Sequence, residues 1–218
     1  MIELFHVSKQ YQAPNWALSD VTIKIQSGDF YFITGPSGSG KTTLLKIIFR
    51  ELLPTEGQII IDGVNLLKIP DREIHRLRQS MGIVFQDFRL LFERTVFDNV
   101  AIPLQVIGEQ RKEIRRRVFN TLRLVNLHQK MWDLPSRLSY GEQQRVAIAR
   151  AIVNAPKIIL ADEPTGNLDW KTGEAVIRLI KALHERRGLS SVIVTHNEKV
   201  ARYCDKLYVM EGGRLKLY

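Results

Sequence analysis

Two glycines, a lysine and a threonine lie at a spacing that can hold a chain of phosphates. Residues 35–42 read GPSGSGKT, so that Gly35, Gly40, Lys41 and Thr42 fit the pattern G-x-x-x-x-G-K-T. Glycines let the backbone curl until successive N–H groups point inward at phosphate oxygens. The lysine then reaches the β- and γ-phosphates, and the threonine hydroxyl ligates Mg²⁺. The pattern therefore predicts a site for a nucleoside triphosphate.

The flanks of this segment supply the context that it needs. Residues 29–34 read as a short buried strand, and residues 43–49 read as a helix with an apolar face. The helix N-terminus adds partial positive charge where the phosphates would lie. The alternative is a Gly/Ser-rich loop that precedes a helix and binds no phosphate. The presence of Lys41 and Thr42 at the positions that the pattern requires argues against it. The other residues predicted to line the phosphate site are Pro36, Ser37, Gly38, Ser39 and Thr43.

Polar side chains also follow three further predicted strands. Asp162 and Glu163 come after one buried strand, Gln86 after a second and His196 after a third. Because the carboxyl ends of parallel strands meet at one rim of a sheet, we expect these groups to gather around the Gly-rich turn. Any one of them could be a surface residue. Together they indicate a single site.

The two adjacent carboxylates at this rim have different predicted roles. Asp162 is placed to hold the Mg²⁺ that Thr42 also contacts. Glu163 would point at the terminal phosphate and polarise the attacking water. Strands often end in acidic residues, so this pair is informative only together with the Gly-rich turn.

Alternating runs of apolar residues predict the elements that position these groups. Further strands are expected at residues 2–7, 21–26, 58–61, 81–85, 157–161, 191–195, 206–210 and 213–217. Tyr11 and Trp16 fall in the predicted loop between the first two strands, where a ring can stack on a base. Helical spacing appears at residues 71–78, 145–153 and 173–187. Asp71 is the predicted cap of the first helix. The predicted apolar side of the last helix comprises Ala175, Val176, Leu179, Ile180 and Leu183.

Composition sets broad limits on the protein. Its 218 residues are 44% hydrophobic, enough for one large domain or a core with an insertion. The single cysteine, Cys204, excludes an internal disulfide and fits a reducing compartment. We see no signal peptide and no apolar stretch of bilayer length, so a soluble cytoplasmic protein is expected. The net charge of +9 suits nucleic acid, an anionic membrane surface or a solvated basic face, and does not decide among them.

The order of these motifs resembles that of the ATP-binding cassette (ABC) ATPases. The resemblance extends over essentially the whole chain and includes LSYGEQQ at residues 138–144 and Leu168-Asp169. It implies an α/β fold, in which a RecA-like P-loop core carries an antiparallel β edge and an inserted α-helical subdomain. Residues 1–86 and 145–218 would form the two parts of the core, and residues 87–144 the helical subdomain.

The resemblance also implies ATP and Mg²⁺ as ligands and a role for each motif. Tyr11 would stack on adenine, Gln86 would sense the metal and water, and His196 would contact the γ-phosphate. Glu163 would be the catalytic base.

A head-to-tail homodimer that forms upon ATP binding is a further implication. Two ATP molecules would lie between the subunits, each held by the Gly-rich turn of one chain and by Ser139, Gly141 and Glu142 of the other. Asp169 would belong to the loop that crosses this interface.

Within the family, residues 84–104 are most similar to cell-division ATPases, while residues 161–169 are shared with lipoprotein-release and macrolide-export ATPases. This implies an ATPase peripheral to the cytoplasmic face of the plasma membrane, where it acts on an integral membrane protein to regulate cell-wall hydrolases. The alternatives are a lipoprotein-release or export ATPase and a slow ATP-gated dimerisation switch. DNA-repair members carry a long coiled coil that the sequence lacks, so no nucleic acid partner is expected.

Tyr140 departs from the family pattern, which usually has Gly at this position of LSGG. If the position requires a positive φ, tyrosine is strained there, and hydrolysis is less assured than binding. The side chain would either obstruct closure of the dimer or pack against the neighbouring chain.

Residues 88–103 are more apolar than a free loop should be, which predicts a socket for a short helix of the membrane partner. The apolar residues are Phe88, Leu90, Leu91, Phe92, Val96 and Phe97. About half of them are expected to fill the core of the helical subdomain instead. Arg89 and Arg94 would lie at the rim of the socket.

Overall fold

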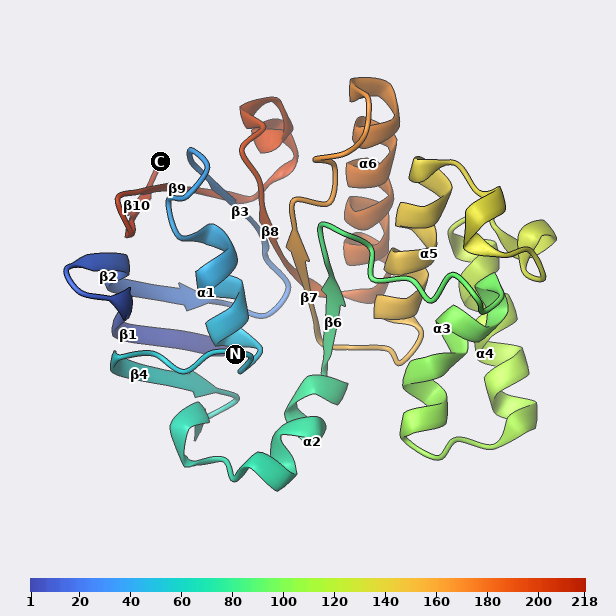
Figure 1. Cartoon of the computed structure of the whole chain (residues 1–218), viewed down its shortest axis with the longest axis horizontal. Helices are drawn as coiled ribbons and strands as arrows, with labels where there is room; N and C mark the ends of the chain where they lie inside the picture. The colour runs from blue at the N-terminus through green and yellow to red at the C-terminus, as the bar shows by residue number, and fades with distance from the viewer.

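The computed structural model contains two sheets packed beside a group of helices (Figure 1). It describes the backbone of residues 1–218 and every side chain except those of Glu198 and Ala201. The larger sheet has the strand order β10-β9-β3-β8-β7-β6. Its parallel strands are β3 (Phe30–Thr34), β6 (Met81–Val84), β7 (Ile158–Asp162), β8 (Ser190–Val194) and β9 (Lys206–Glu211). Only β10 (Arg214–Leu217) among the described strands of this sheet is antiparallel to its neighbour.

The central strands are continuous apolar runs because both faces of the sheet are covered. All five residues of β3 are buried, and the first four alternate between two hydrophobic clusters. Phe30 and Phe32 face the helices that follow in the chain, whereas Tyr31 and Ile33 face the helix after the Gly-rich turn and the second sheet. This alternation follows from the pleat of the strand.

The second sheet is antiparallel and has the order β2-β1-β4-β5. Its strands are β1 (Ile2–Gln12), β2 (Asn15–Ile25), β4 (Glu56–Ile61) and β5 (Val64–Asn65). The first two strands are longer than predicted, so Tyr11 and Trp16 lie on strands and not in a loop. Their backbone pairs beyond the packed core through a bulged register, where no apolar alternation marks a strand.

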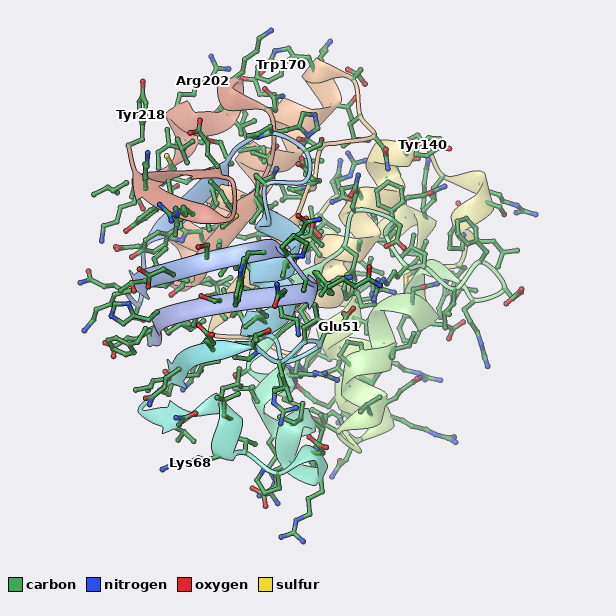
Figure 2. All side chains as sticks on the ribbon, turned by 60° about the vertical axis from the view of Figure 1, so that its left-hand side comes forward. Glu51, Lys68, Tyr140, Trp170, Arg202 and Tyr218 are labelled. Carbon is green, nitrogen blue, oxygen red and sulfur yellow. The ribbon has the colours of Figure 1, made fainter. Side chains whose placement is uncertain are left out.

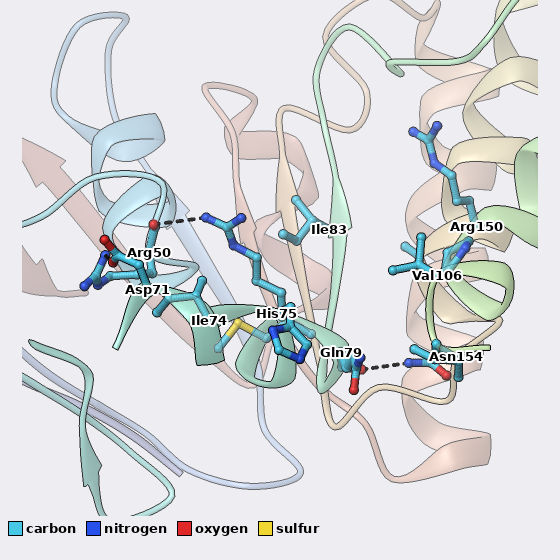
Figure 3. Close-up of a pocket in the computed structure, with 14 residues that line it drawn as sticks. Arg50, Asp71, Ile74, His75, Gln79, Ile83, Val106, Arg150 and Asn154 are labelled. Atoms are coloured by element: carbon cyan, nitrogen blue, oxygen red, sulfur yellow. Dashed lines mark hydrogen bonds and ion pairs between the residues drawn. The ribbon is translucent and has the colours of Figure 1, made fainter. Parts of the chain in front are cut away.

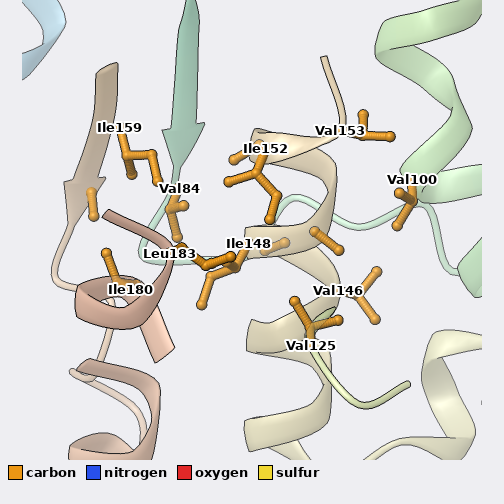
Figure 4. Close-up of a cluster of buried hydrophobic side chains, with 14 of the residues drawn as sticks. Val84, Val100, Val125, Val146, Ile148, Ile152, Val153, Ile159, Ile180 and Leu183 are labelled. Atoms are coloured by element: carbon orange, nitrogen blue, oxygen red, sulfur yellow. The ribbon is translucent and has the colours of Figure 1, made fainter. Parts of the chain in front are cut away.

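The described structure contains six α-helices. They are α1 (Lys41–Ile48), α2 (Ile74–Gln79), α3 (Val96–Val106), α4 (Arg111–Leu124), α5 (Tyr140–Ile152) and α6 (Trp170–Arg187). Figure 1 shows α3, α4 and the start of α5 together at one end of the molecule. Helix α5 runs from this group to the sheet, where Ile148 and Ile152 join a buried cluster with Val84, Ile180 and Leu183 (Figure 4).

Three predicted helix details are wrong. Asp71 does not cap a helix, since it begins the short 3₁₀ turn Asp71–Glu73 and pairs with Arg50 at 3.2 Å. Helix α6 begins at Trp170 because the Asp169 carboxylate accepts the N–H of Thr172 at 3.1 Å, a cap that the sequence reading missed. Ala175 is exposed on this helix, and Ile177 is buried in its place.

No helix among the described residues is both long and apolar enough to cross a membrane.

Candidate nucleotide site

The Gly-rich turn between β3 and α1 accepts only glycine at its two tightest positions. Gly35 has φ 147°, and a Cβ atom there would collide with the carbonyl oxygen of Met210. Gly40 has φ 108°, and its Cβ would collide with the carbonyl oxygen of Ala17. The turn therefore folds against two neighbouring strands while its backbone opens toward the start of α1. This is the strand–turn–helix arrangement that the sequence predicts.

Lys41 is nearly fully buried at the start of α1. Its Nζ donates to the carbonyl oxygens of Gly35 at 2.8 Å and Pro36 at 2.9 Å. An ammonium group has three donors, so a phosphate oxygen can take the third while the loop holds the side chain in place. The lysine is thus fixed over the turn before any ligand binds.

Thr42 and Asp162 meet across the ends of α1 and β7. The Thr42 hydroxyl donates to Asp162 Oδ1 at 3.0 Å. Burial raises the pKa of the Asp162 carboxyl, while the hydrogen bond from Thr42 lowers it, and the charge of Glu163 adds to the rise. A hydroxyl and a carboxylate are oxygen donors of the kind that Mg²⁺ accepts. A divalent cation here would offset the desolvation of Asp162.

Glu163 has the most unusual surroundings of the site. Its backbone is left-handed, with φ 44°, and its side chain is buried. Oε1 lies 3.0 Å from His196 Nδ1, whereas Oε2 is buried and has no hydrogen-bond partner among the described residues. Strained backbone and an unpartnered buried carboxylate oxygen both cost stability, and both are typical of functional sites.

A pocket of about 470 Å³ brings most of the predicted groups together. Ser37, Gly38, Gly40, Lys41, Thr42 and Thr43 line one side of it, and Tyr11, Gln86, Glu163 and His196 line the rest. Tyr11 stands at its mouth, largely exposed, with its hydroxyl 3.3 Å from Thr43 Oγ1. Asp162 lines an adjoining pocket with Thr42 and Gln86.

Three predicted groups lie outside this pocket at the N-terminus of α5. Ser139 caps the helix, and its side chain and that of Glu142 bond reciprocally to each other's backbone N–H. Glu142 also accepts from Lys130 at 2.7 Å, the largest cause of its lowered pKa. Gly141, two residues after Ser139, packs against Thr172 of α6 and has no room for a side chain. The segment is therefore rigid, and within one chain it does not reach the Gly-rich turn.

Tyr140 adopts ordinary helical backbone at the first position of α5, so no positive φ is required of it. Its side chain is 64% exposed, with one edge against the ring of Phe88 at 6.2 Å between centroids. Figure 2 shows Tyr140 and Trp170 on the same upper edge of the molecule. Asp169, beside Trp170, is likewise exposed there.

The loop after Gln86 is held by two residues that the sequence reading missed. Phe88 and Arg89 are both left-handed, and the Arg150 guanidinium donates to their two carbonyl oxygens, at 2.5 Å to Phe88 and 2.6 Å to Arg89. Asn99, fully buried, bonds the backbone of Leu91, Arg94 and Thr95 through its side chain. The available signal for Asn99 was a polar residue beside Val96, Val100 and Ala101 in the expected helical subdomain.

The proposed socket is only partly exposed. Phe88, Leu90 and Val96 are buried in the helical core, and Phe97 packs against that core and stacks on Trp132. Leu91 and Phe92 remain exposed. Phe88 is therefore not a surface on which a partner can dock.

Comparison with known families decides the class of protein. The family model described as "ABC transporter" matches residues 18–166. The chain belongs to this family. It is accordingly an ATP-binding ATPase of the ABC type, with the mixed α/β fold of that class.

Individual members of the ABC family are similar over nearly the whole chain. The cell division ATP-binding protein FtsE of Bacillus subtilis is 46% identical over 98% of this chain and 93% of its own length. FtsE of Escherichia coli K12 is 44% identical over 99% and 97%. The methionine import ATP-binding protein MetN of Helicobacter hepaticus is 43% identical over 99% of this chain and 62% of its own length. A dimeric, post-hydrolysis structure of the ATP-binding cassette MJ0796, bound to ADP and phosphate, has a TM-score of 0.89 at 40% identity, covering 99% and 97% of the two chains.

Proposed function

We propose that this ABC ATPase is an FtsE-type subunit that binds and hydrolyses ATP to act on an FtsX-like integral membrane protein during cell division. The pocket that joins Lys41, Glu163 and His196 supports the ATPase activity. Full-length similarity to FtsE proteins supports the division role. The protein would then be peripheral to the cytoplasmic face of the plasma membrane and would regulate cell-wall hydrolases through its partner.

The geometry supports a division of labour among the site residues. Lys41 and the N–H groups of the turn bind the β- and γ-phosphates, and Tyr11 stacks on the adenine at the mouth of the pocket. Thr42, Asp162 and Gln86 would hold Mg²⁺, which would supply positive charge against the negative charge of the phosphates.

Hydrolysis would use the carboxylate that follows β7. Glu163 accepts a proton from the water that attacks the γ-phosphate, through the oxygen that has no hydrogen-bond partner among the described residues. His196, 3.0 Å from the other oxygen, fixes the rotamer of Glu163 and contacts the γ-phosphate.

A second copy of the chain would complete each site. Ser139, Gly141 and Glu142 lie at an exposed helix N-terminus, which favours an anion, and they cannot reach the Gly-rich turn of their own chain. We propose that they meet the γ-phosphate bound by a partner copy, with Asp169 crossing between the two copies. Residues 87–144 would move as one body against a core of residues 1–86 and 145–218, joined by α5.

Replacing Tyr140 with glycine is expected to weaken the ATP-bound dimer about tenfold, because exposed aromatic residues are common anchors of interfaces. Tyr140→Phe keeps the ring and its contact with Phe88, so it should dimerise as the wild type does. Sedimentation velocity at saturating ATP measures both variants. An unchanged Tyr140→Gly dimer with faster turnover would show that the tyrosine obstructs closure instead.

The membrane partner has a better candidate site than the predicted socket. A groove of about 610 Å³ lies between α2 and the C-terminal ends of α3 and α5 (Figure 3). Ile74, Ile83, Val106 and Ile107 give it apolar walls, and Asn154 spans its base by donating to the carbonyl of Gln79 at 3.1 Å. This apolar channel with polar rims suits a short amphipathic helix.

Arg150 connects this groove to the nucleotide site. It lines the groove and also holds the carbonyls of Phe88 and Arg89, two and three residues after Gln86. Burial lowers the pKa of the Arg150 guanidinium without removing its charge at neutral pH. A movement of Gln86 on nucleotide binding would therefore be transmitted to the groove through the side chain of Arg150.

Val106→Asp is expected to reduce capture of the membrane partner at least tenfold, because it places a charge on an apolar wall of the groove. Val106 is 74% exposed, so folding and ATP binding should be unchanged. Leu217→Asp is the matched control, since Leu217 is 67% exposed on β10, away from the groove. The measurement is co-purification from detergent-solubilised membranes. Equal capture of the membrane partner by both variants would show that the partner binds outside the groove.

The same capture experiment tests the proposed function as a whole. Tagged wild-type chain should retain an FtsX-like protein from membranes of its own cell. Retention of a methionine permease or a lipoprotein-release protein would assign the chain to a transporter. Retention of no integral membrane protein, together with slow ATP turnover, would favour an ATP-gated dimerisation switch.

A further inference from the structure

Within residues 66–79 and the first five residues of α4, five exposed cations make no ion pair or side-chain hydrogen bond with any residue that the structure describes. They are Lys68, Arg76, Arg111, Lys112 and Arg115. Other cations near them are neutralised. Arg116 pairs with Glu113 at 2.6 Å, and Arg117 lies 3.4 Å from Glu109. The five therefore carry positive charge that no described residue near them neutralises.

The five cations flank the groove on both sides. Lys68 and Arg76 belong to the segment that contains α2, and the other three belong to the first five residues of α4. Figure 1 and Figure 2 both place α2 and the turn between α3 and α4 along the same lower edge of the molecule. We define this set, together with Val106 and Ile107 at that turn, as the basic edge.

Large apolar side chains protrude between the cations of the basic edge. Val106 is 74% exposed and Ile107 is 37% exposed, and both precede Arg111 and Lys112 by four to six positions in the chain. A surface that faces only water gains no stability from exposed apolar side chains beside unpaired cations. Cations around protruding apolar residues are the composition of surfaces that lie on lipid headgroups, where the apolar groups enter the upper acyl region.

We propose that the basic edge binds anionic phospholipid headgroups directly. This inference rests on the proposed function, because a membrane protein docked in the groove brings both of its sides near the bilayer. A docked helix occupies the space between the two sides, whereas a flat bilayer can contact both sides at once. The negative potential of the cytoplasmic leaflet attracts each cation that comes within about 10 Å of it. Lipid contact would then add to the affinity of the chain for its partner and orient it on the membrane.

The test is sedimentation of the purified chain with vesicles that contain no protein. Wild type should bind vesicles of phosphatidylcholine and phosphatidylglycerol, release as salt is raised, and fail to bind phosphatidylcholine alone. Each cation near an anionic surface is worth about a fivefold gain in binding. The triple variant Arg111→Glu, Lys112→Glu, Arg115→Glu should therefore bind at least a hundredfold more weakly.

A second triple variant separates the basic edge from net charge. Arg186→Glu, Arg214→Glu, Lys216→Glu makes the same change in charge at exposed positions on α6 and β10, and it should bind anionic vesicles nearly as wild type does. Equal loss in both triple variants, or wild-type binding by the first, would overturn the proposal.

Capture of the partner in detergent distinguishes lipid from protein. There the first triple variant should behave as wild type, because no bilayer is present. If it loses partner capture while wild type ignores anionic vesicles, the cations contact an acidic segment of that protein, and the lipid proposal is wrong. Failure of vesicle binding leaves the proposed function standing, which the Val106→Asp variant tests separately.

Discussion

Glu163→Gln is expected to lower the rate of ATP hydrolysis about a thousandfold and to leave ATP affinity unchanged. A positioned general base contributes a factor of roughly 10²–10⁴, and glutamine keeps the size of the side chain while losing the base. The unpartnered Oε2 of Glu163 is the atom that would take the proton from water. Because the proposed phosphate contacts come from Lys41 and the Gly-rich turn, binding should survive.

The control for this variant is Glu185→Gln, which makes the same chemical change at an exposed position of α6. Phosphate release under saturating ATP measures turnover, and calorimetric titration with ATP measures affinity. Wild-type turnover in Glu163→Gln would mean that another group activates the water. Lost ATP affinity would mean that Glu163 belongs to the binding surface.

Lys41→Ala is expected to weaken ATP binding roughly a hundredfold, because the variant loses charge-assisted hydrogen bonds worth about 3 kcal/mol. Among the residues that the structure describes, the side chain bonds to two loop carbonyls of its own turn, so the fold should persist. Lys216→Ala on β10 removes a lysine without touching the pocket and serves as the control. The measurement is calorimetric titration with ATP. Unchanged ATP affinity in Lys41→Ala would show that the phosphates do not bind at this turn.

Much of the site could be predicted because its signals are local. The spacing of Gly40, Lys41 and Thr42 is that of one turn in contact with one phosphate chain. The whole signal therefore lies within residues 35–42. Gln86, Asp162 and His196 could be grouped because parallel strands end at one rim. The structure brings Gln86 and His196 to the pocket of Lys41, and Asp162 to Thr42. The catalytic roles of these residues stay predictions.

What the sequence reading missed depends on contacts between distant segments. Arg150 holds Phe88 and Arg89 from about sixty positions away, and no pattern around Arg150 marks it. Phe88 looks like a surface anchor in sequence, yet the helical core buries it. Strain was expected at Tyr140 because the family usually has glycine at this position. The structure shows no such strain, since Tyr140 has ordinary helical backbone.

The same limit explains the β hairpin. Tyr11 and Trp16 lie on strands because β1 and β2 pair with each other beyond the core, and such pairing needs no buried apolar face. A prediction based on apolar alternation ends the strands where burial ends. The end of the hairpin nevertheless carries Tyr11 to the pocket of Lys41, where the proposed stacking on adenine would take place.

Light scattering on Glu163→Gln, with and without Mg²⁺ and ATP, tests the central claim most directly. The claim is that ATP joins two copies of this chain into composite sites, and slow turnover lets the joined state accumulate. We predict a mass of 25.1 kDa without nucleotide and twice that mass with ATP. Lys41→Ala in the same background should remain at the lower mass. A monomer at saturating ATP, in a variant that binds ATP normally, would contradict the account.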